Sequence, residues 1–142
     1  ADAFARWATI RVLGTDEHSI ELLADRRDRF NEGLTTSDAR LAAGNALWFA
    51  WLDEAIGALA IPIALEELDR ADSTAAGLDR AVRRAAGMSL DEATRDLQTW
   101  ALLTGDRDDG RHVSFAGRMP DPTFSGEADW LPAISVQSDA PI

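Results

Sequence analysis

The sequence predicts an all-α protein, an irregular bundle of five or six helices with orthogonal crossings and an extended, proline-rich C-terminal tail. Residues 46–52 form an unbroken apolar run with two Trp, inside the segment GNALWFAWLDEAIG at 44–57. A helix that is apolar on nearly all sides must be surrounded by other elements. The flanking segments show helical spacing and clear helix-end residues, and four of the five prolines follow residue 105.

The first two helices are predicted from their ends. The first is expected to run from Asp2 to Leu13 and to end at Gly14, because glycine adopts a positive φ without strain. Thr15 is the expected N-cap of the second helix, and two acidic residues follow it at the positive helix start. This helix should reach about Phe30.

The third helix contains the apolar run and is expected to be the centre of the domain. Thr36 or Ser37 is its predicted N-cap, and Gly57 is its predicted end. Pro62 suits the first turn of a fourth helix, where the missing N–H group of proline costs nothing. The third helix should therefore be enclosed by the others.

Two further helices have the clearest signals. A fifth is predicted over 74–86, with Ser73 as its N-cap. A sixth begins at a capping box formed by Ser89 and Glu92 and continues in helical spacing to residue 104. Because only two residues separate these helices, we expect them to pack as a tight pair.

The character of the chain changes after residue 105. We predict a helical domain over 1–105 and, over 106–142, an extended tail that packs on the helices or leads to a following domain. Weak alternation predicts short strands at 112–115 and 134–136. The aromatic residues of the tail are too apolar for a purely disordered segment.

Composition limits the function. The chain has a formal charge of −11, and all 14 of its cationic residues are Arg. This balance disfavours nucleic acid and anionic membranes as partners. Arg80, Arg83 and Arg84 form a local cluster that is interpreted as a solvated helix face or, alternatively, as a phosphate site. The absence of Cys excludes disulfides and thiolate chemistry, and no apolar run is long enough to cross a bilayer.

Each histidine has a functional and a plain interpretation. His18 lies at a helix start among acidic residues, and a metal site there would need further ligands from elsewhere; the plain interpretation is a solvated helix start. His112 is interpreted as a surface residue. The segment 106–110, DRDDG, resembles half of a calcium loop but lacks the full spacing, so a charged turn is the other interpretation.

The acidic pairs Asp53–Glu54 and Glu66–Glu67 do not converge, because adjacent helical residues point about 100° apart; solvated faces explain them. Asn45 lies in line with apolar residues and is expected to be buried with a hydrogen-bond partner. That partner is either a neighbouring loop or a ligand. From the residues, we predict no catalytic residue, no metal ligand and no cofactor.

Three segments together resemble gluzincin-type zinc metallopeptidases. The opening DAFARW resembles their "acid–small–apolar–Ala" helix, and residues 44–57 are similar to their downstream core helix. The segment from Ala86 through Gly105 is similar to their closing helix pair. The likeness is to the C-terminal helical part of a group of secreted bacterial members, and it covers most of residues 1–120.

The resemblance implies that the zinc histidines and the catalytic Glu would lie upstream of residue 1. Asp2 stands where these proteins have a Glu as third zinc ligand, and Asp is one methylene shorter. The implied function is a non-catalytic helical subdomain of a larger secreted or periplasmic protein, with the rest of that parent chain as its partner. The alternatives are a free-standing acidic protein-interaction module and, less favoured, a small-molecule-binding bundle around Asn45.

Overall fold

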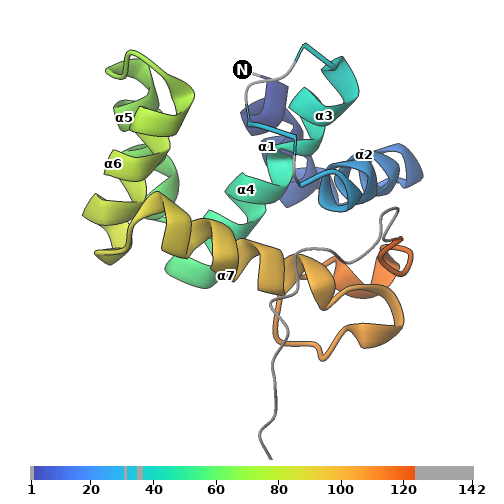
Figure 1. The fold of residues 1–142 in the computed structure, drawn as a ribbon. Coiled ribbons are helices and arrows are strands. Elements are labelled where there is room, and N and C mark those ends of the chain that lie inside the picture. Colours follow the sequence, from blue (N-terminus) through green and yellow to red (C-terminus); the bar gives the residue numbers. More distant parts are fainter. Residues whose placement is uncertain (1, 31, 35–36, 124–142) are drawn as a thin grey trace, which may run out of the picture.

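The computed structural model describes residues 2–30, 32–34 and 37–123, and this part of the chain is all-helical, with no strand (Figure 1). Short turns of other helix types accompany the α-helices. The elements are α1 (Asp2–Leu13), α2 (Glu17–Asp28), α3 (Ala39–Gly44), α4 (Ala46–Trp51), the π-helical turn η1 (Leu52–Ile56), α5 (Ala60–Asp69), α6 (Thr74–Ala86), α7 (Leu90–Leu102) and the 3₁₀ turns η2 (Gly105–Arg107) and η3 (Ala116–Arg118).

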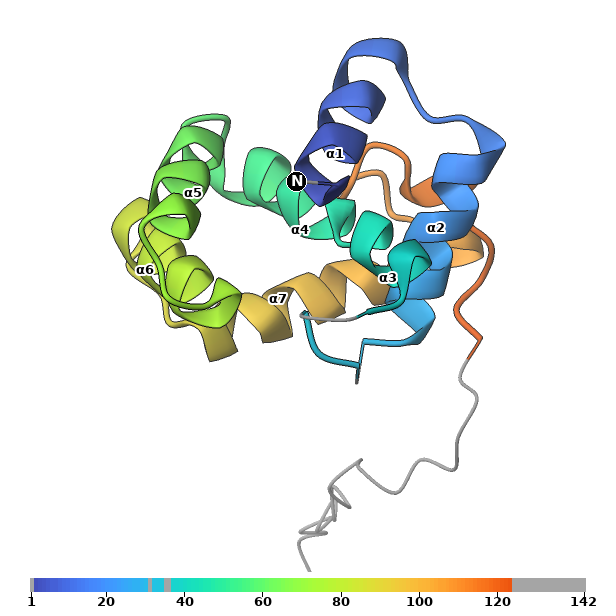
Figure 2. The same cartoon turned by 90° about the horizontal axis from the view of Figure 1, so that it is seen from above.

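The predicted central helix is present and enclosed. The segments α3, α4 and η1 follow one another as one rod, interrupted at Asn45, so the described residues form six helical rods. All residues from Ala46 to Leu52 are buried. Figure 2 shows this rod with α5 and α6 on one side and α1 and α2 on the other. The Trp-rich segment is therefore the core of the domain, as its composition predicts.

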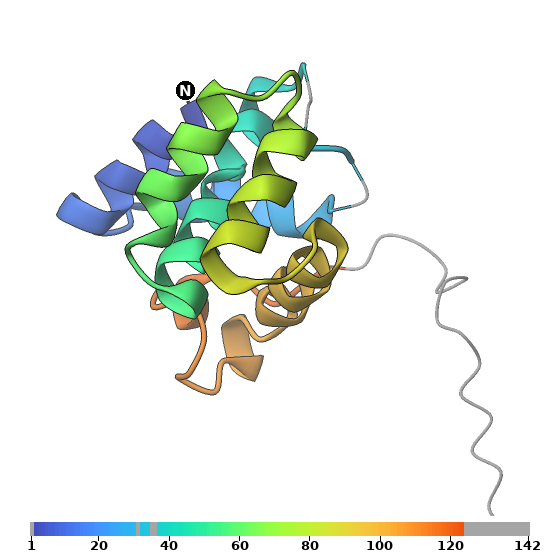
Figure 3. The same cartoon turned by 90° about the vertical axis from the view of Figure 1, so that its left-hand side faces the viewer.

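The helix pair that packs most closely differs from the predicted one. The helices α5 and α6 lie side by side along their length (Figure 3), and α7 crosses below them instead of running alongside α6. Gly77 makes the α5–α6 approach possible, since a Cβ there would lie 3.0 Å from the Cα of Leu68. The short α6–α7 connection does not dictate close packing, because α7 instead turns away to cover the central rod.

The far side of the rod is covered by α2 and by the segment that follows α7. Gly44 lets α3 approach α2, because a Cβ there would lie 2.5 Å from the carbonyl oxygen of Leu22. Residues after 105 join the same core, including Val113, Phe115 and Met119, which are all buried. The strand predicted at 112–115 is wrong, since turns replace it there; the strand predicted at 134–136 lies outside the described residues.

The predicted helix ends are partly corrected. Asp16, not Thr15, caps α2 by accepting a hydrogen bond from the backbone N–H of Ser19, at 2.7 Å. Asp38, not Ser37, caps α3. Both corrections move the cap to a neighbouring aspartate, whose carboxylate is a strong acceptor for the unpaired N–H groups of a first turn. The caps Ser73 and Ser89 are confirmed, including the Ser89–Glu92 capping box.

No helix within the described residues has the length and apolar character that a membrane span requires.

Candidate functional site

A groove of about 600 Å³ separates α1 from the α5–α6 hairpin, with the central rod as its floor. Its size falls in the range of small-molecule sites. The lining is largely apolar and includes three aromatic side chains. These residues are Asp2, Ala3, Phe4, Leu34, Ala42, Asn45, Trp48, Phe49, Leu65, Leu68, Ala71, Asp72, Ser73, Thr74 and Leu78.

Two lining residues carry buried polar atoms that have no hydrogen-bond partner among the described residues. Asn45 donates from Nδ2 to the carbonyl oxygen of Leu34 at 3.0 Å, which confirms the predicted bond to a neighbouring loop. Its Oδ1, however, is buried and accepts no hydrogen bond from the described residues. The indole Nε1 of Trp48 is likewise buried and unpaired, and Trp48 is only 3% exposed. Such atoms are uncommon in folded proteins, and each calls for an explanation.

The rim of the groove is acidic. Asp2 and Asp72 both line it and are exposed, and neither has an ion pair within the described residues. The helix α6 also begins at this rim, and the start of a helix contributes about half a positive charge. Arg6 is the cation that flanks Asp2, but its Nη1 faces the Ser19 hydroxyl at 3.5 Å.

The α1 helix is held on the rod by an aromatic cluster. The Phe4 ring lies edge-on to Phe49 with centroids 5.7 Å apart, and Trp7 lies 6.2 Å from the same ring. Arg11 anchors the other end of α1 through an ion pair with Asp53 at 2.9 Å. No residue of α1 is fully buried, so these contacts are what position Asp2 at the groove.

The two histidines lie apart from the groove. His18 is exposed at the start of α2, with Nδ1 4.0 Å from Glu21, which agrees with a solvated helix start. The His112 ring is more enclosed than a surface residue. It lies edge-on to Trp100 at 4.9 Å, and its Nδ1 is 2.6 Å from Asp109. This contact, followed by the backbone N–H of Arg111, lowers the pKa of the Asp109 carboxyl.

The calcium-like segment forms a charged turn. Asp108 and Asp109 accept hydrogen bonds from backbone N–H groups two residues further on, and the backbone N–H of Asp106 bonds to Asp121. In the part of the chain that the structure describes, no cluster of three or more His, Asp or Glu residues could hold a metal ion.

The first acidic pair connects separate parts of the fold. Asp53 and Glu54 leave the π-helical turn in different directions: Asp53 binds Arg11, and Glu54 accepts hydrogen bonds from the N–H and hydroxyl of Ser114. They do not converge, as predicted. Both carboxylates hold other segments against the rod.

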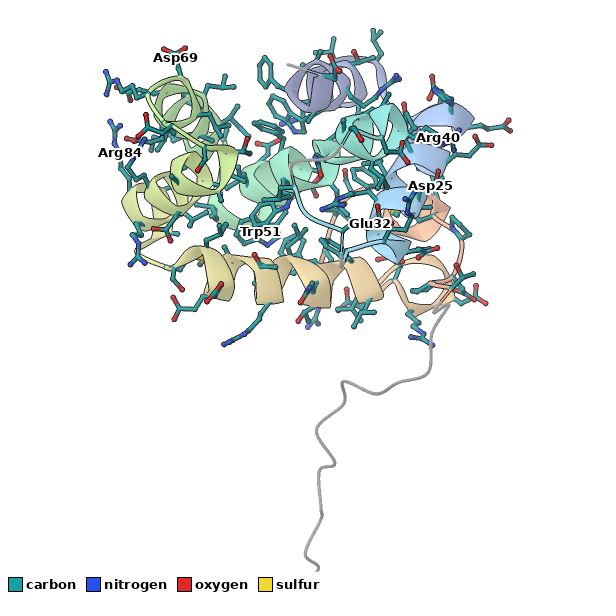
Figure 4. All side chains as sticks on the ribbon, turned by 45° about the horizontal axis from the view of Figure 1, so that its top comes forward. Asp25, Glu32, Arg40, Trp51, Asp69 and Arg84 are labelled. Carbon is teal, nitrogen blue, oxygen red and sulfur yellow. The ribbon has the colours of Figure 1, made fainter. Side chains whose placement is uncertain are left out.

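The second acidic pair holds the α5–α6 hairpin together. Glu66 and Glu67 pair with Arg84 across the hairpin, and Glu67 also pairs with Arg80. Figure 4 shows Arg84 on the outer side of the hairpin. Arg83 pairs with Asp79 on α6. The Arg cluster is thus an exposed, ion-paired helix face, in agreement with the solvated interpretation.

Comparisons with family models, with curated proteins and with solved structures found no significant match to this chain. The described part of the chain is an all-helical bundle with a partly apolar groove whose rim is acidic. Among the groove residues, the sequence singled out Asn45 as a buried polar residue, Ser73 as a helix cap and, through the resemblance, Asp2. Asp72 and Trp48 carried no such signal, because the groove forms only when α1 and the hairpin meet over the rod.

Proposed function

We propose that this chain is the non-catalytic helical wall of a binding cleft in a larger exported, metallopeptidase-like protein. The observation that supports this role is the position of α1. Aromatic contacts hold this helix on the rod and place its first residue, Asp2, at the rim of the groove. By the resemblance to gluzincin-type metallopeptidases, the same residue stands where those proteins have a zinc ligand. The partner of this surface is the rest of the parent chain.

In this proposal the chain forms and supports one wall of the cleft, and it supplies no complete catalytic or metal-binding group. A single carboxylate cannot hold a zinc ion or activate its water, and Asp2 belongs to no group of three or more candidate metal ligands among the described residues. Two histidines and a general base from the preceding segment would have to complete a site. The rigid attachment of α1 would then fix the direction of the third ligand.

Metal analysis of two forms of the protein tests this proposal. The isolated chain should contain no stoichiometric zinc, whereas the chain encoded by the complete reading frame should bind one zinc ion per molecule. Asp2→Ala in the longer protein should weaken zinc binding, and Asp69→Ala, on the outer side of α5, should not. A reading frame without an H-E-x-x-H segment upstream of residue 1 would overturn the proposal.

A second candidate is a free-standing acidic interaction module. It is favoured by three large apolar side chains that face solvent, Val12 at 78%, Leu13 at 80% and Leu59 at 80% exposure, on a chain of charge −11. Exposed apolar side chains are typical of contact surfaces when they gather in a patch. Sedimentation velocity should then show association that Leu13→Ser reduces, and a strict monomer at all concentrations would contradict it.

A further inference from the structure

We propose that the groove between α1 and the α5–α6 hairpin is a docking site for the segment 130–134, WLPAI, of the same chain. The docked segment competes with any other apolar partner for the groove. This inference goes beyond the proposed function. It concerns the isolated chain and requires no parent protein, so either proposal can fail without the other.

The walls of the groove favour an apolar occupant. Phe4 of α1 and two leucines of α5, Leu65 and Leu68, line it, and all three side chains are only half-buried. Leu34, in the loop after α2, is a further half-buried lining residue. Covering such side chains removes apolar surface from water, which is favourable. At about 600 Å³, the groove has room for several side chains of one occupant.

The segment 130–134 has the composition that this groove requires. It contains Trp130, Leu131 and Ile134 and no charged residue. Pro132 fixes its own φ and restricts the backbone of the residue before it. Less conformational entropy is therefore lost when this segment is ordered than when an unrestricted one is.

The described chain ends where this segment can reach the groove. The Thr123 hydroxyl donates to Asp28 Oδ2 at 2.6 Å, at the end of α2. Leu34 follows Asp28 by six residues, so about 22 Å is the largest separation that the chain allows between them. The seven residues from 123 to 130 can extend about 24 Å, and residues 131–134 extend that reach further.

Apolar contact must provide the stabilisation, because the groove offers no cation to the segment. The lining residues that the structure describes include no Arg, Lys or His. Residues 124–142 contain acidic residues, Glu127, Asp129 and Asp139, and no basic ones. High salt weakens ion pairs between exposed groups and leaves apolar contacts in place. The docking should therefore persist at 1 M NaCl, a concentration at which the screening length is about 3 Å.

Paramagnetic relaxation measures the docking in the full chain. The sequence has no Cys, so Ser135→Cys creates a single attachment point for a nitroxide label beside the segment. In the ¹⁵N-labelled protein, the label should broaden the backbone N–H resonances of Leu65 and Leu68. The resonance of Gln98 should stay sharp, because α7 crosses below the rod, away from the groove (Figure 1).

Matched variants of the labelled chain locate both partners. Trp130→Ser combined with Leu131→Ser should lower the ratio of docked to free segment about ten-fold or more, the value of burying one large apolar side chain. Ile142→Ser, outside the segment, should change it little. On the groove side, Leu65→Gln should weaken the docking, whereas Leu59→Gln, at a residue that is 80% exposed and outside the lining, should not.

Four results would overturn the proposal. One is broadening spread evenly over the described residues, and another is an equal effect of Ile142→Ser and of the double variant. Loss of the broadening at 1 M NaCl would indicate an ionic contact instead. The fourth is broadening that appears only when spin-labelled ¹⁴N chains are mixed with unlabelled-spin ¹⁵N chains, which would assign the groove to a second copy. Circular dichroism of each variant checks that the fold is retained.

Discussion

The two sides of the central rod are held by different kinds of contact. On one side, α5 and α6 are neighbours in sequence, and they are joined by exposed ion pairs and by the close approach at Gly77. On the other side, α2 binds a segment more than 75 residues away through one buried arginine, Arg27. The first side depends on local contacts, and the second depends on long-range ones.

Arg27 is the centre of the long-range side. Its guanidinium donates to the Thr104 hydroxyl at 2.8 Å, to the Pro120 carbonyl at 2.5 Å and to the Asp121 carbonyl at 3.3 Å. It also pairs with Asp28 at 2.7 Å. This one side chain, 5% exposed, joins α2 to the end of α7 and to the segment after η3. The hairpin side has no buried polar anchor of this kind within the described residues.

The largest expected effect comes from removing this anchor. Arg27→Met should destabilise the protein by about 3–5 kcal/mol, because it breaks a buried ion pair and leaves buried acceptors without a donor. Urea unfolding measures the loss. Hydrogen exchange should show residues 113–119 losing protection before α5 and α6 do. An equal loss of protection on both sides of the rod would contradict the distinction between a side held by local contacts and a side held by long-range contacts.

The matched variant on the hairpin side is Arg80→Met. Arg80 is exposed and pairs with Glu67 at 3.1 Å, and exposed ion pairs contribute little because water screens them. Its loss in free energy of unfolding should be far smaller than that of Arg27→Met. Comparable losses would show that local ion pairs matter as much as the buried anchor.

The second prediction compares the two glycines at which helices approach. Gly44→Ala should cost about 2–3 kcal/mol, because the new Cβ would meet the backbone oxygen of Leu22, and backbone cannot move aside cheaply. Gly77→Ala should cost about 1 kcal/mol or less, since its nearest contacts are at 3.0 Å and alanine regains up to about 1 kcal/mol of helix propensity. Thermal denaturation of both variants measures the difference, and a reversed order would contradict it.

The third prediction tests the helix caps on each side. Ser89→Ala should cost about 1 kcal/mol, because it removes the capping box at the start of α7. Ser37→Ala should have no measurable effect, since Asp38 and not Ser37 caps α3. The two variants remove the same hydroxyl from an exposed or half-buried position, so their melting temperatures compare directly. A larger loss of stability for Ser37→Ala than for Ser89→Ala would indicate that Ser37 caps α3, as the sequence predicts.

The comparison also shows what could be predicted from the sequence. The bounds of α1 and α6, the cap at Ser73 and the enclosed Trp-rich segment follow from neighbouring residues, because caps and helical spacing are local properties. Arg27 could not be identified in this way. It lies in the charged run Asp25–Arg29, which has the composition of an exposed helix face, and all its partners except Asp28 lie 77 to 94 residues away.

The groove was equally hard to predict. Asn45 could be singled out, because a polar residue in an apolar stripe must find partners. The acidic rim could not, since Asp2 and Asp72 approach the same groove only after α1 and the hairpin dock on the rod. Their sequence surroundings are those of ordinary helix starts. The fold class was therefore predictable from local patterns, whereas the groove required the tertiary arrangement.

The smallest effect concerns the ion pairs of the hairpin side and their dependence on pH. The Arg84 guanidinium, followed by Arg80, lowers the pKa of the Glu67 carboxyl below its ordinary value of 4.5. A lowered folded-state pKa means that the unfolded chain takes up the proton first as the pH falls. The stabilisation is therefore complete above pH 4.5 and is lost as the pH falls through the folded-state value.

Glu67→Gln removes the titratable carboxyl. Comparing this variant with the parent protein therefore isolates the contribution of that carboxyl to stability. The variant should be slightly less stable than the parent protein at pH 7, and the two should converge in melting temperature as the pH falls below 4.5. High salt at pH 7 should also reduce the difference, because both arginines are half-exposed and their pairs are screened. A difference that persists unchanged at low pH and in high salt would mean that Glu67 stabilises the hairpin by packing and not by charge. The hairpin side would then resemble the Arg27 side more closely than its exposed ion pairs indicate.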